Sequence, residues 1–317
     1  MSDLIDDISA LLGLPRANCE GIARTAPNRY KVFYIPKRNG RDLGLVAQPA
    51  REVKAIQRLI IQLIENKLPI HDAATAYRSG GSIFKNAKPH AAARFITKLD
   101  CENFFPCIDR TSLRRHLAKY LLELTPNEID FILSACCWRP KGTSTQRLCI
   151  GAPTSPMLSN SIMYEVDRDI SNMCAEVDVV YTRYSDDICI SATRPDVLGE
   201  LERKIRSRIA QNKFPSLTLN DKKRVSVGRG NAMNVTGLTL SNTGLVTVGR
   251  KRKRGVRSGA MHYINGILSA DEIFRLKGEI AFVISVEPGY RYVLWNTYGA
   301  AIAPLLPRIQ RAVGETT

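Results

Sequence analysis

Two adjacent aspartates, Asp186 and Asp187, lie between two β-favouring runs, residues 179–184 and 188–191. This pattern predicts a β-hairpin with both carboxylates at its tip. Carboxylates held so close repel each other unless a divalent cation lies between them, and hard cations prefer oxygen ligands. Paired aspartates are also common at turns, where the side chains bond their own backbone. The hairpin alone therefore leaves two interpretations open, a metal site and an ordinary turn.

A third carboxylate, Asp100, follows another β-favouring run at residues 95–99. This run predicts a short strand that ends at Asp100. Three carboxylates at adjoining strand ends are what a two-metal phosphoryl-transfer site requires, since one ion activates the attacking oxygen and the other stabilises the leaving one. The interpretation makes Asp100, Asp186 and Asp187 the candidate catalytic metal ligands.

The segment Gly-Ala-Pro-Thr-Ser-Pro, residues 151–156, precedes an apolar stripe at helical spacing. It predicts a helix capped by Ser155 or Thr154, with Pro156 at the first helical position. The order of the strand ending in Asp100, this segment and the Tyr-Ser-Asp-Asp hairpin resembles the palm of reverse transcriptases. The resemblance implies an α+β right-hand polymerase fold with fingers, a palm whose antiparallel sheet packs on helices, and a helical thumb.

Two further stretches resemble the bacterial retron branch of that family. Asn86-Ala87-Lys88-Pro89-His90 is similar to its Asn-Ala-x-x-His element, and residues 235–237 are similar to its Val-Thr-Gly element. The resemblance runs from about residue 30 to 298. It implies an RNA-directed DNA polymerase that copies part of its own structured non-coding RNA from an RNA 2′-hydroxyl and leaves a branched RNA–DNA hybrid (msDNA) used in anti-phage defence.

The same resemblance implies a cofactor and partners. The cofactor is a pair of Mg²⁺ ions, for which Mn²⁺ can substitute. The partners are the cognate non-coding RNA with its msDNA product, deoxynucleoside triphosphates, and a defence effector such as an ATPase with an HNH-type nuclease. The alternatives are another RNA-templated polymerase of the group II intron or diversity-generating kind, and a non-catalytic RNA-binding scaffold. Two features argue against another RNA-templated polymerase: the element with Asn86 and His90, and the lack of room for maturase or endonuclease domains. The presence of all three carboxylates argues against a non-catalytic scaffold.

Several residues acquire expected roles by resemblance, each with a simpler alternative. Lys223 matches the lysine that protonates departing pyrophosphate, although a lysine in a surface loop is otherwise solvated charge. Phe105 matches the bulky residue beside the sugar 2′ position, although an aromatic side chain there can also belong to the core. Nucleotide and template contacts are expected from three consecutive residues, Gly151, Ala152 and Pro153.

The fingers contain one departure from the family pattern. Residues 30–36 and 43–47 predict a β-hairpin, and relatives carry in its second strand an arginine that contacts the incoming triphosphate. The matching position here is Gly44. Arg41 or Arg38 can take over this contact, and the sequence does not decide between them.

The chain carries 46 Lys and Arg against 30 Asp and Glu, a formal charge of +16, which favours a polyanionic partner. Residues 250–254 form a dense basic run in the predicted thumb. Such a run is usually a solvated face, but in a chain with a phosphoryl-transfer site it predicts phosphate contact. The predicted RNA-binding residues are Asn86, His90, Arg250, Lys251, Arg252, Lys253, Arg254 and Arg257.

The predicted organisation has four parts: an N-terminal helical segment (1–29), fingers (30–95), a palm with finger insertions (96–240) and an RNA-binding thumb (241–317). The acidic N-terminus does not resemble a signal peptide, and no apolar run approaches membrane-spanning length. We therefore expect a cytoplasmic protein with free thiols, and the resemblance implies a bacterial one. The eight cysteines and four histidines show no zinc-ligand spacing.

Overall fold

The computed structural model describes residues 3–36 and 43–308. The chain divides into two compact units, one formed by residues 1–82 and 93–228 and the other by residues 83–92 and 229–317. Each is described by itself. The predicted boundaries of fingers, palm and thumb remain a prediction, because this division follows packing and not function.

The larger unit begins with helices that form because apolar side chains recur at helical spacing. The Asp3 side chain accepts hydrogen bonds from the backbone N–H groups of Ile5 and Asp6 in α1, and α7 begins with a capping box of Thr125 and Glu128. The helices are α1 (Leu4–Leu12), α2 (Arg16–Thr25), α3 (Arg51–Ile64), α5 (Phe104–Cys107), α6 (Arg110–Tyr120), α7 (Pro126–Cys136), α8 (Ser155–Ile162), α9 (Tyr164–Ala175) and α10 (Asp196–Ala210).

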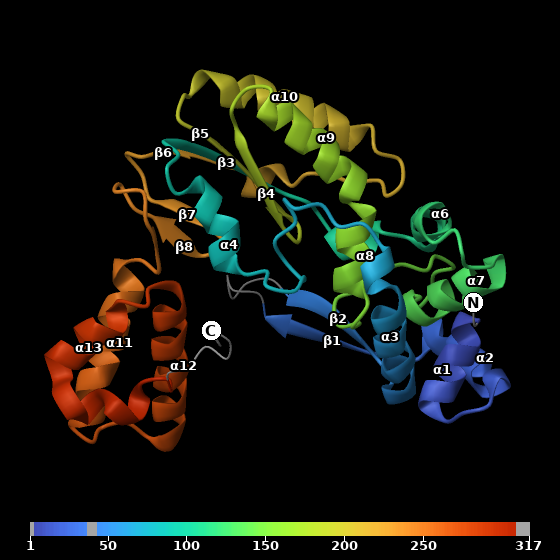
Figure 1. Cartoon of the computed structure of the whole chain (residues 1–317), viewed down its shortest axis with the longest axis horizontal. Helices are drawn as coiled ribbons and strands as arrows, with labels where there is room; N and C mark the ends of the chain where they lie inside the picture. The colour runs from blue at the N-terminus through green and yellow to red at the C-terminus, as the bar shows by residue number, and fades with distance from the viewer. Residues whose placement is uncertain (1–2, 37–42, 309–317) are drawn as a thin grey trace, which may run out of the picture. The chain divides into compact units, whose positions relative to one another are not determined.

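The larger unit also contains two antiparallel sheets. One is the predicted hairpin of β1 (Tyr30–Pro36) and β2 (Leu43–Pro49). The other has the strand order β4-β5-β3-β6, formed by β3 (Phe95–Asp100), β4 (Val180–Tyr184), β5 (Asp187–Ala192) and β6 (Val225–Gly228). Figure 1 shows α9 and α10 lying side by side along this sheet. One continuous hydrophobic core joins the helices to the sheet.

The smaller unit combines a short sheet with helices. It contains α4 (Ile83–Ala87), β7 (Met233–Val235), β8 (Leu238–Leu240), β9 (Val246–Thr247), α11 (Arg250–Ile264), α12 (Ala270–Val286) and α13 (Tyr290–Tyr298). Helix α12 begins with a capping box formed by Ser269 and Glu272. Among the described residues, no helix has the length and apolar character needed to cross a bilayer.

Candidate active site

The predicted aspartates meet at one end of the four-stranded sheet. Strand β4 pairs with β5 so that Tyr184 faces Asp187, which confirms the hairpin. Asp100 ends β3 and is the cross-strand partner of Asp187, while the N–H of Cys101 donates to the carbonyl oxygen of Asp186 at 2.9 Å. Strand register therefore brings together carboxylates that are more than 80 residues apart in the sequence.

The electrostatics of this cluster indicate a shortage of positive charge. Burial raises the pKa of Asp187 to about 6, and the charges of Asp186 and Asp100 add to the effect. Burial also raises the pKa of Asp186, again with a contribution from Asp100. Lys223 partly offsets this charge, since its Nζ donates to Oδ1 of Asp100 at 2.7 Å and this bond raises the pKa of Lys223.

The donor chemistry of the cluster fits hard divalent cations. Within residues 3–36 and 43–308, no three or more His, Cys, Asp or Glu side chains already stand in metal-binding geometry. The carboxylates nevertheless destabilise one another's charged forms, and a bound cation with oxygen ligands would relieve that repulsion. In the structure, the Lys223 ammonium provides part of this compensation at Asp100. The assignment of Asp100, Asp186 and Asp187 as metal ligands stays a prediction.

A buried ion pair behind the hairpin fixes its tip. Arg183 is fully buried and donates from Nε and Nη2 to the carboxylate of Asp167 at 2.8 and 2.7 Å. Its Nη1 donates at 2.9 Å to the carbonyl oxygen of Ser185, whose φ of 60° lies in the left-handed region. Tyr181 adds a hydrogen bond from its hydroxyl to Asp167 at 2.7 Å. Because Ser185 directly precedes Asp186, this network holds the carboxylate-bearing turn.

Arg183 and Asp167 are not among the site residues predicted from the sequence. A signal was present, because each charged residue interrupts an apolar pattern: Arg183 lies in a β-favouring run, and Asp167 lies beside Val166 on a helix whose apolar stripe continues to Ile170. Charged residues in such positions are rarely fully buried unless they are paired.

The same arginine ties a distant segment to the hairpin. Its backbone N–H donates to the carbonyl oxygen of Ala73 at 2.7 Å, and its carbonyl oxygen accepts from Thr75 at 2.9 Å. Asn160 completes the attachment by donating to the carbonyl oxygen of Ala76 at 2.6 Å. The next residue, Tyr77, is thereby held near the hairpin.

Tyr77 belongs to an aromatic cluster beside the aspartates. Its ring centroid lies 6.3 Å from that of Phe105 and 6.5 Å from that of Tyr184. Tyr77 has a φ of 56° and is 47% exposed, a combination of strained backbone and open surface that is found at functional sites. Of the two consecutive phenylalanines, Phe104 is a core residue, whereas Phe105 is partly exposed and can face a ligand.

The Gly151 loop is held against the fingers hairpin. Gly151 has a φ of 113°, and a Cβ there would lie 2.8 Å from the carbonyl oxygen of Ala47, so only glycine fits. The N–H of Ala47 donates to the carbonyl oxygen of Ile150 at 2.9 Å. Ala152 is buried and Pro153 is partly exposed.

The predicted side-chain cap of α8 is wrong. The helix begins at Ser155 with Thr154 at the capping position, but the Thr154 side chain makes no capping hydrogen bond. The hydroxyl of Ser155 instead accepts from the backbone N–H of Cys149 at 3.4 Å. The reason is local, because Thr154 is already in helical backbone conformation and not in the extended one that a capping side chain needs.

The structure does not test the predicted triphosphate contacts of the fingers. Arg38 and Arg41 lie outside the described residues, whereas Gly44 lies in β2. The choice between the two arginines stays open.

The two retron-type elements meet inside the smaller unit. Nδ2 of Asn86 donates to the hydroxyl of Thr236 at 3.4 Å, and that hydroxyl donates to the carbonyl oxygen of Ile83 at 3.2 Å. Asn86 and His90 are both buried, and burial lowers the pKa of His90 to about 4. Their side chains are therefore enclosed, and their assignment as RNA-binding residues stays a prediction.

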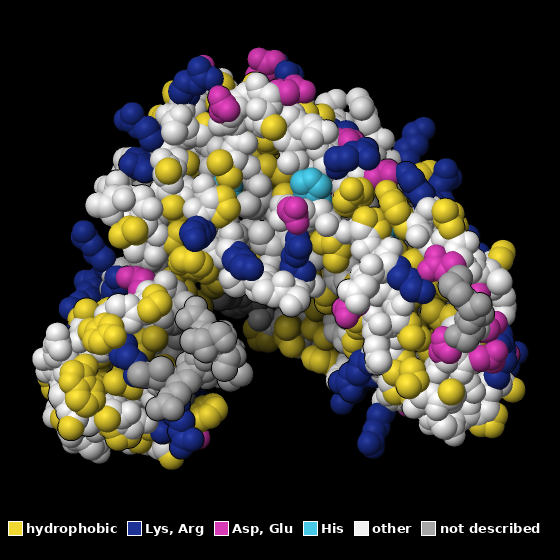
Figure 2. Space-filling model, viewed as in Figure 1, with side chains coloured by type: hydrophobic (Ala, Val, Ile, Leu, Met, Phe, Trp, Pro, Cys, Tyr) yellow, Lys and Arg dark blue, Asp and Glu magenta, His cyan; other side chains and the backbone are white. Residues whose placement is uncertain are grey.

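The predicted basic run forms the first turns of α11. Two of its members are engaged by carboxylates, Arg252 by Glu279 at 3.2 Å and Lys253 by Glu287 at 2.5 Å. The other four are exposed or partly exposed and form no ion pair with any described residue: Arg250, Lys251, Arg254 and Arg257. On the face shown in Figure 2, Lys and Arg side chains are scattered and do not form a single patch.

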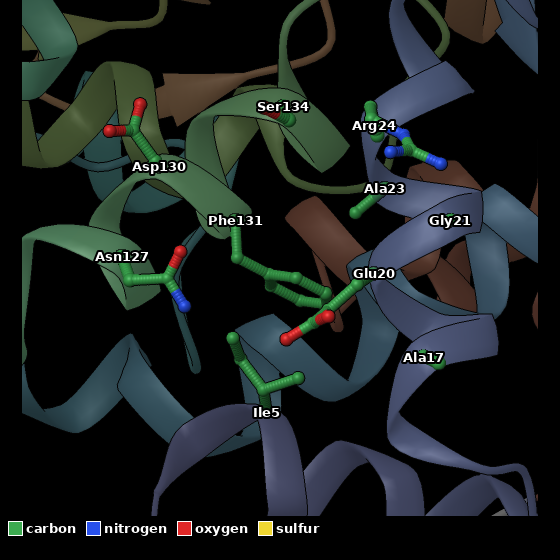
Figure 3. Close-up of a pocket in the computed structure, with 10 residues that line it drawn as sticks. All are labelled: Ile5, Ala17, Glu20, Gly21, Ala23, Arg24, Asn127, Asp130, Phe131 and Ser134. Carbon is green, nitrogen blue, oxygen red and sulfur yellow. The ribbon is translucent and has the colours of Figure 1, made fainter.

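A hollow of about 550 Å³ lies among α1, α2 and α7. Figure 3 shows Ile5 and the Phe131 ring pointing into it, with the charged side chains of Glu20, Arg24 and Asp130 around them. Asp130 is already engaged by Arg110 at 2.6 Å. None of the predicted catalytic residues lines this hollow.

Comparisons with known proteins agree with this geometry. The family model described as reverse transcriptase (RNA-dependent DNA polymerase) matches residues 35–240. The chain is 34% identical to the Retron Ec83 reverse transcriptase of Escherichia coli over 92% of this chain and 95% of that protein. It is 30% identical to the Retron Mx65 reverse transcriptase of Myxococcus xanthus over 89% of this chain and 68% of that protein.

Among solved structures, the chain is similar to a telomerase from Candida albicans in complex with a TWJ fragment of telomeric RNA. The TM-score is 0.50 at 12% identity, and the match covers 90% of this chain and 56% of the telomerase chain. This likeness concerns the fold alone. Together with the family match it confirms the predicted α+β right-hand polymerase fold.

The family match covers both carboxylate-bearing strand ends, and the retron relatives align with most of the chain. The chain therefore belongs to the reverse transcriptase family, as a bacterial retron reverse transcriptase with RNA-directed DNA polymerase activity.

Proposed function

We propose that this enzyme reverse-transcribes part of its own structured non-coding RNA, starting from an RNA 2′-hydroxyl, and leaves a branched RNA–DNA hybrid (msDNA) that serves in anti-phage defence. The observation that carries the catalytic part is the convergence of Asp100, Asp186 and Asp187 at one sheet end. The priming mode and the role in defence rest on the kinship with retron enzymes.

Two Mg²⁺ ions would be held by Asp100 and Asp186, with Asp187 supporting the position of Asp186, and Mn²⁺ can replace them. When bound, the ions supply activation of the primer hydroxyl and stabilisation of the charge that develops on the phosphate. The raised pKa values of Asp186 and Asp187 support this role, because they show that the charged forms are destabilised and a dication would relieve that destabilisation.

Lys223 would protonate or neutralise the departing pyrophosphate. Its ammonium already points at the carboxylate cluster through Asp100, and the hydrogen bond keeps it protonated. A positioned acid of this kind stabilises a leaving group that carries increasing negative charge.

The nucleotide would lie against Phe105 and the Gly151 loop. Phe105 would exclude a ribose 2′-hydroxyl sterically, with Tyr77 packing beside it. Gly151, Ala152 and Pro153 would line the nucleotide and template side, and Arg41 is the proposed triphosphate contact from the fingers.

RNA would be bound mainly by the exposed cations of α11, while Asn86 and His90 shape the same unit from within. Arg252 and Lys253 would contribute less, because carboxylates already compensate their charges. The proposed partners are the cognate non-coding RNA, its msDNA product, deoxynucleoside triphosphates, and a defence effector such as an ATPase with an HNH-type nuclease. The proposed location is the bacterial cytoplasm.

The test is purification of the enzyme from its native cells with its bound nucleic acid, followed by separate digestion with RNase and DNase. A short DNA that shifts in size but stays attached to a ribonucleotide after RNase treatment is the expected result. Extension of that species by the purified complex should stop in EDTA and resume with Mg²⁺. Bound RNA without any covalently attached DNA would contradict the priming proposal.

A further inference from the structure

A second polar cavity lies on the larger unit, among α6, α9, α10 and the loop that follows α10. Its volume is about 600 Å³. None of the predicted catalytic, metal-binding or nucleotide-binding residues lines it. No role in the polymerase reaction accounts for its composition, which is rich in basic and aromatic side chains.

The cavity carries an excess of positive charge. Its lining contains four basic side chains, Arg115, Lys119, Arg208 and Lys213, and one carboxylate, Glu165. Glu165 pairs with Lys119, and Arg208 donates to Asp169 at 2.7 Å. Arg115 and Lys213 form no ion pair with any residue in the described part of the chain. Two uncompensated cations therefore face the same cavity, an arrangement that favours a phosphate.

An exposed aromatic ring accompanies these two cations in the lining. Phe214 is 44% exposed and directly follows Lys213. The guanidinium carbon of Arg115 lies 4.2 Å from the centroid of the Phe214 ring. An arginine stacked on an exposed ring offers two features that single-stranded nucleic acid uses together, a flat surface for a base and a cation for the adjoining phosphate.

We propose that this cavity binds single-stranded nucleic acid, with a phosphate held by Arg115 and Lys213 and a neighbouring base stacked on Phe214. A duplex fits less well, because its bases are paired inside the helix and cannot reach the ring. RNA and DNA share the phosphate and the base, so both are candidate strands. The site deepens the proposed function and rests on it, since it would hold the template or product at a place away from the carboxylates.

The direct test is photo-crosslinking of the full-length enzyme, freed of nucleic acid, to mixed-sequence single-stranded 12-mers that carry 5-iodouracil. One 12-mer is RNA and the other is DNA, and crosslinked peptides are mapped by mass spectrometry. We expect a crosslink on the peptide containing Phe214. Double substitution of Arg115→Gln and Lys213→Gln should reduce this crosslink by about fivefold or more while crosslinks elsewhere persist.

Lys204→Gln is the matched control, because Lys204 is an exposed cation of α10 whose charge is compensated by Glu200 at 3.2 Å. It should leave the crosslink unchanged. Phe214→Ala should weaken 12-mer binding, and an unchanged thermal midpoint would exclude misfolding.

The outcomes distinguish RNA from DNA as the bound strand and identify the results that would overturn the proposal. A stronger crosslink with the RNA or with the DNA 12-mer identifies the strand. No crosslink at Phe214, or a loss that Lys204→Gln reproduces, would overturn the proposal. Competitors added before irradiation give a further test. If a poly-glutamate peptide lowers the crosslinking yield but excess unlabelled 12-mer does not, the proposal is overturned and the site binds an acidic protein partner. Because crosslinking needs no polymerisation, it can succeed even where the proposed priming fails.

Discussion

Arginine is used in opposite ways by the two units of this enzyme. Arg183 is fully buried, and each branch of its guanidinium has a fixed partner in Asp167 or Ser185. On α11, Arg250 and Arg254 are exposed and form no ion pair with a described residue. The first arrangement determines geometry, because a buried charge cannot leave its partner without a large penalty. The second favours affinity for phosphate, because exposed cations release counterions when they meet a polyanion.

The comparison predicts that substitutions at the sheet end change chemistry or folding, whereas substitutions on α11 change RNA affinity. Lys223 is an intermediate case. It is more than half exposed, yet its ammonium is held by the nearly buried carboxylate of Asp100.

Outside the three aspartates, the largest expected effect is on catalysis at Lys223. Lys223→Gln should lower the rate of single-nucleotide incorporation by about 100- to 10,000-fold, because the leaving pyrophosphate loses its proton donor. Lys222→Gln is the control, since Lys222 is an exposed neighbour of the same charge. Rapid-quench kinetics at saturating nucleotide measure both. Equal rates for the two variants would remove Lys223 from the reaction.

Asp167→Ala tests how much the buried ion pair with Arg183 contributes to stability. It should lower the free energy of unfolding by about 3–5 kcal/mol, because Arg183 would stay buried without its partner. The control Glu279→Ala removes the partner of the partly exposed Arg252 and should cost less than about 1 kcal/mol.

The two unfolding experiments can be read unit by unit. Trp138 lies in the larger unit and Trp295 in the smaller one, so denaturation followed by fluorescence in Trp295→Phe and Trp138→Phe backgrounds reports each separately. Similar losses for Asp167→Ala and Glu279→Ala would mean that burial does not distinguish the two arginines.

Neutralising the exposed cations tests the α11 side. Replacing Arg250, Lys251, Arg254 and Arg257 by glutamine should weaken binding of the cognate RNA and reduce the slope of log affinity against log salt by about one for each phosphate that α11 no longer binds. Arg252→Gln with Lys253→Gln should have a smaller effect. Equal loss of DNA synthesis on a generic primer-template would mean that α11 binds any duplex and does not select the cognate RNA.

The smallest expected effect concerns sugar selection. Phe105→Ala should raise incorporation of ribonucleotides relative to deoxynucleotides by roughly tenfold, because the ring no longer occupies the space of a 2′-hydroxyl. Phe104→Leu is the neighbouring control, since Phe104 belongs to the core. Competition between the two nucleotide types in one reaction gives the ratio. An unchanged ratio in folded Phe105→Ala would assign Phe105 to packing.

The sequence predicted the elements whose signals are local. The hairpin at Asp186 and the strand ending at Asp100 each depend on neighbouring residues, and both are present. The ordered carboxylate motifs also identified the family, because few folds require that order.

The sequence did not predict contacts that depend on tertiary packing. The segment from Ala73 to Tyr77 is attached to the hairpin region by hydrogen bonds to Arg183 and Asn160, which lie more than 80 residues away in the sequence. No local sequence pattern indicates that pairing. The burial of Asn86 and His90 was also not predicted, because polar residues are usually exposed. The partner of Asn86, Thr236, lies 150 residues away in the sequence.

The most direct test of the account is Asp186→Asn, studied in one preparation for two activities. RNA-templated DNA synthesis in Mg²⁺ should fall below detection, because the amide removes a charged metal ligand. The dissociation constant for the cognate RNA, measured at the same salt, should stay within about twofold of the unsubstituted enzyme, because affinity resides in distributed cations. Synthesis that persists in Asp186→Asn would contradict the catalytic assignment, and parallel loss of RNA binding would contradict the separation of geometry from affinity.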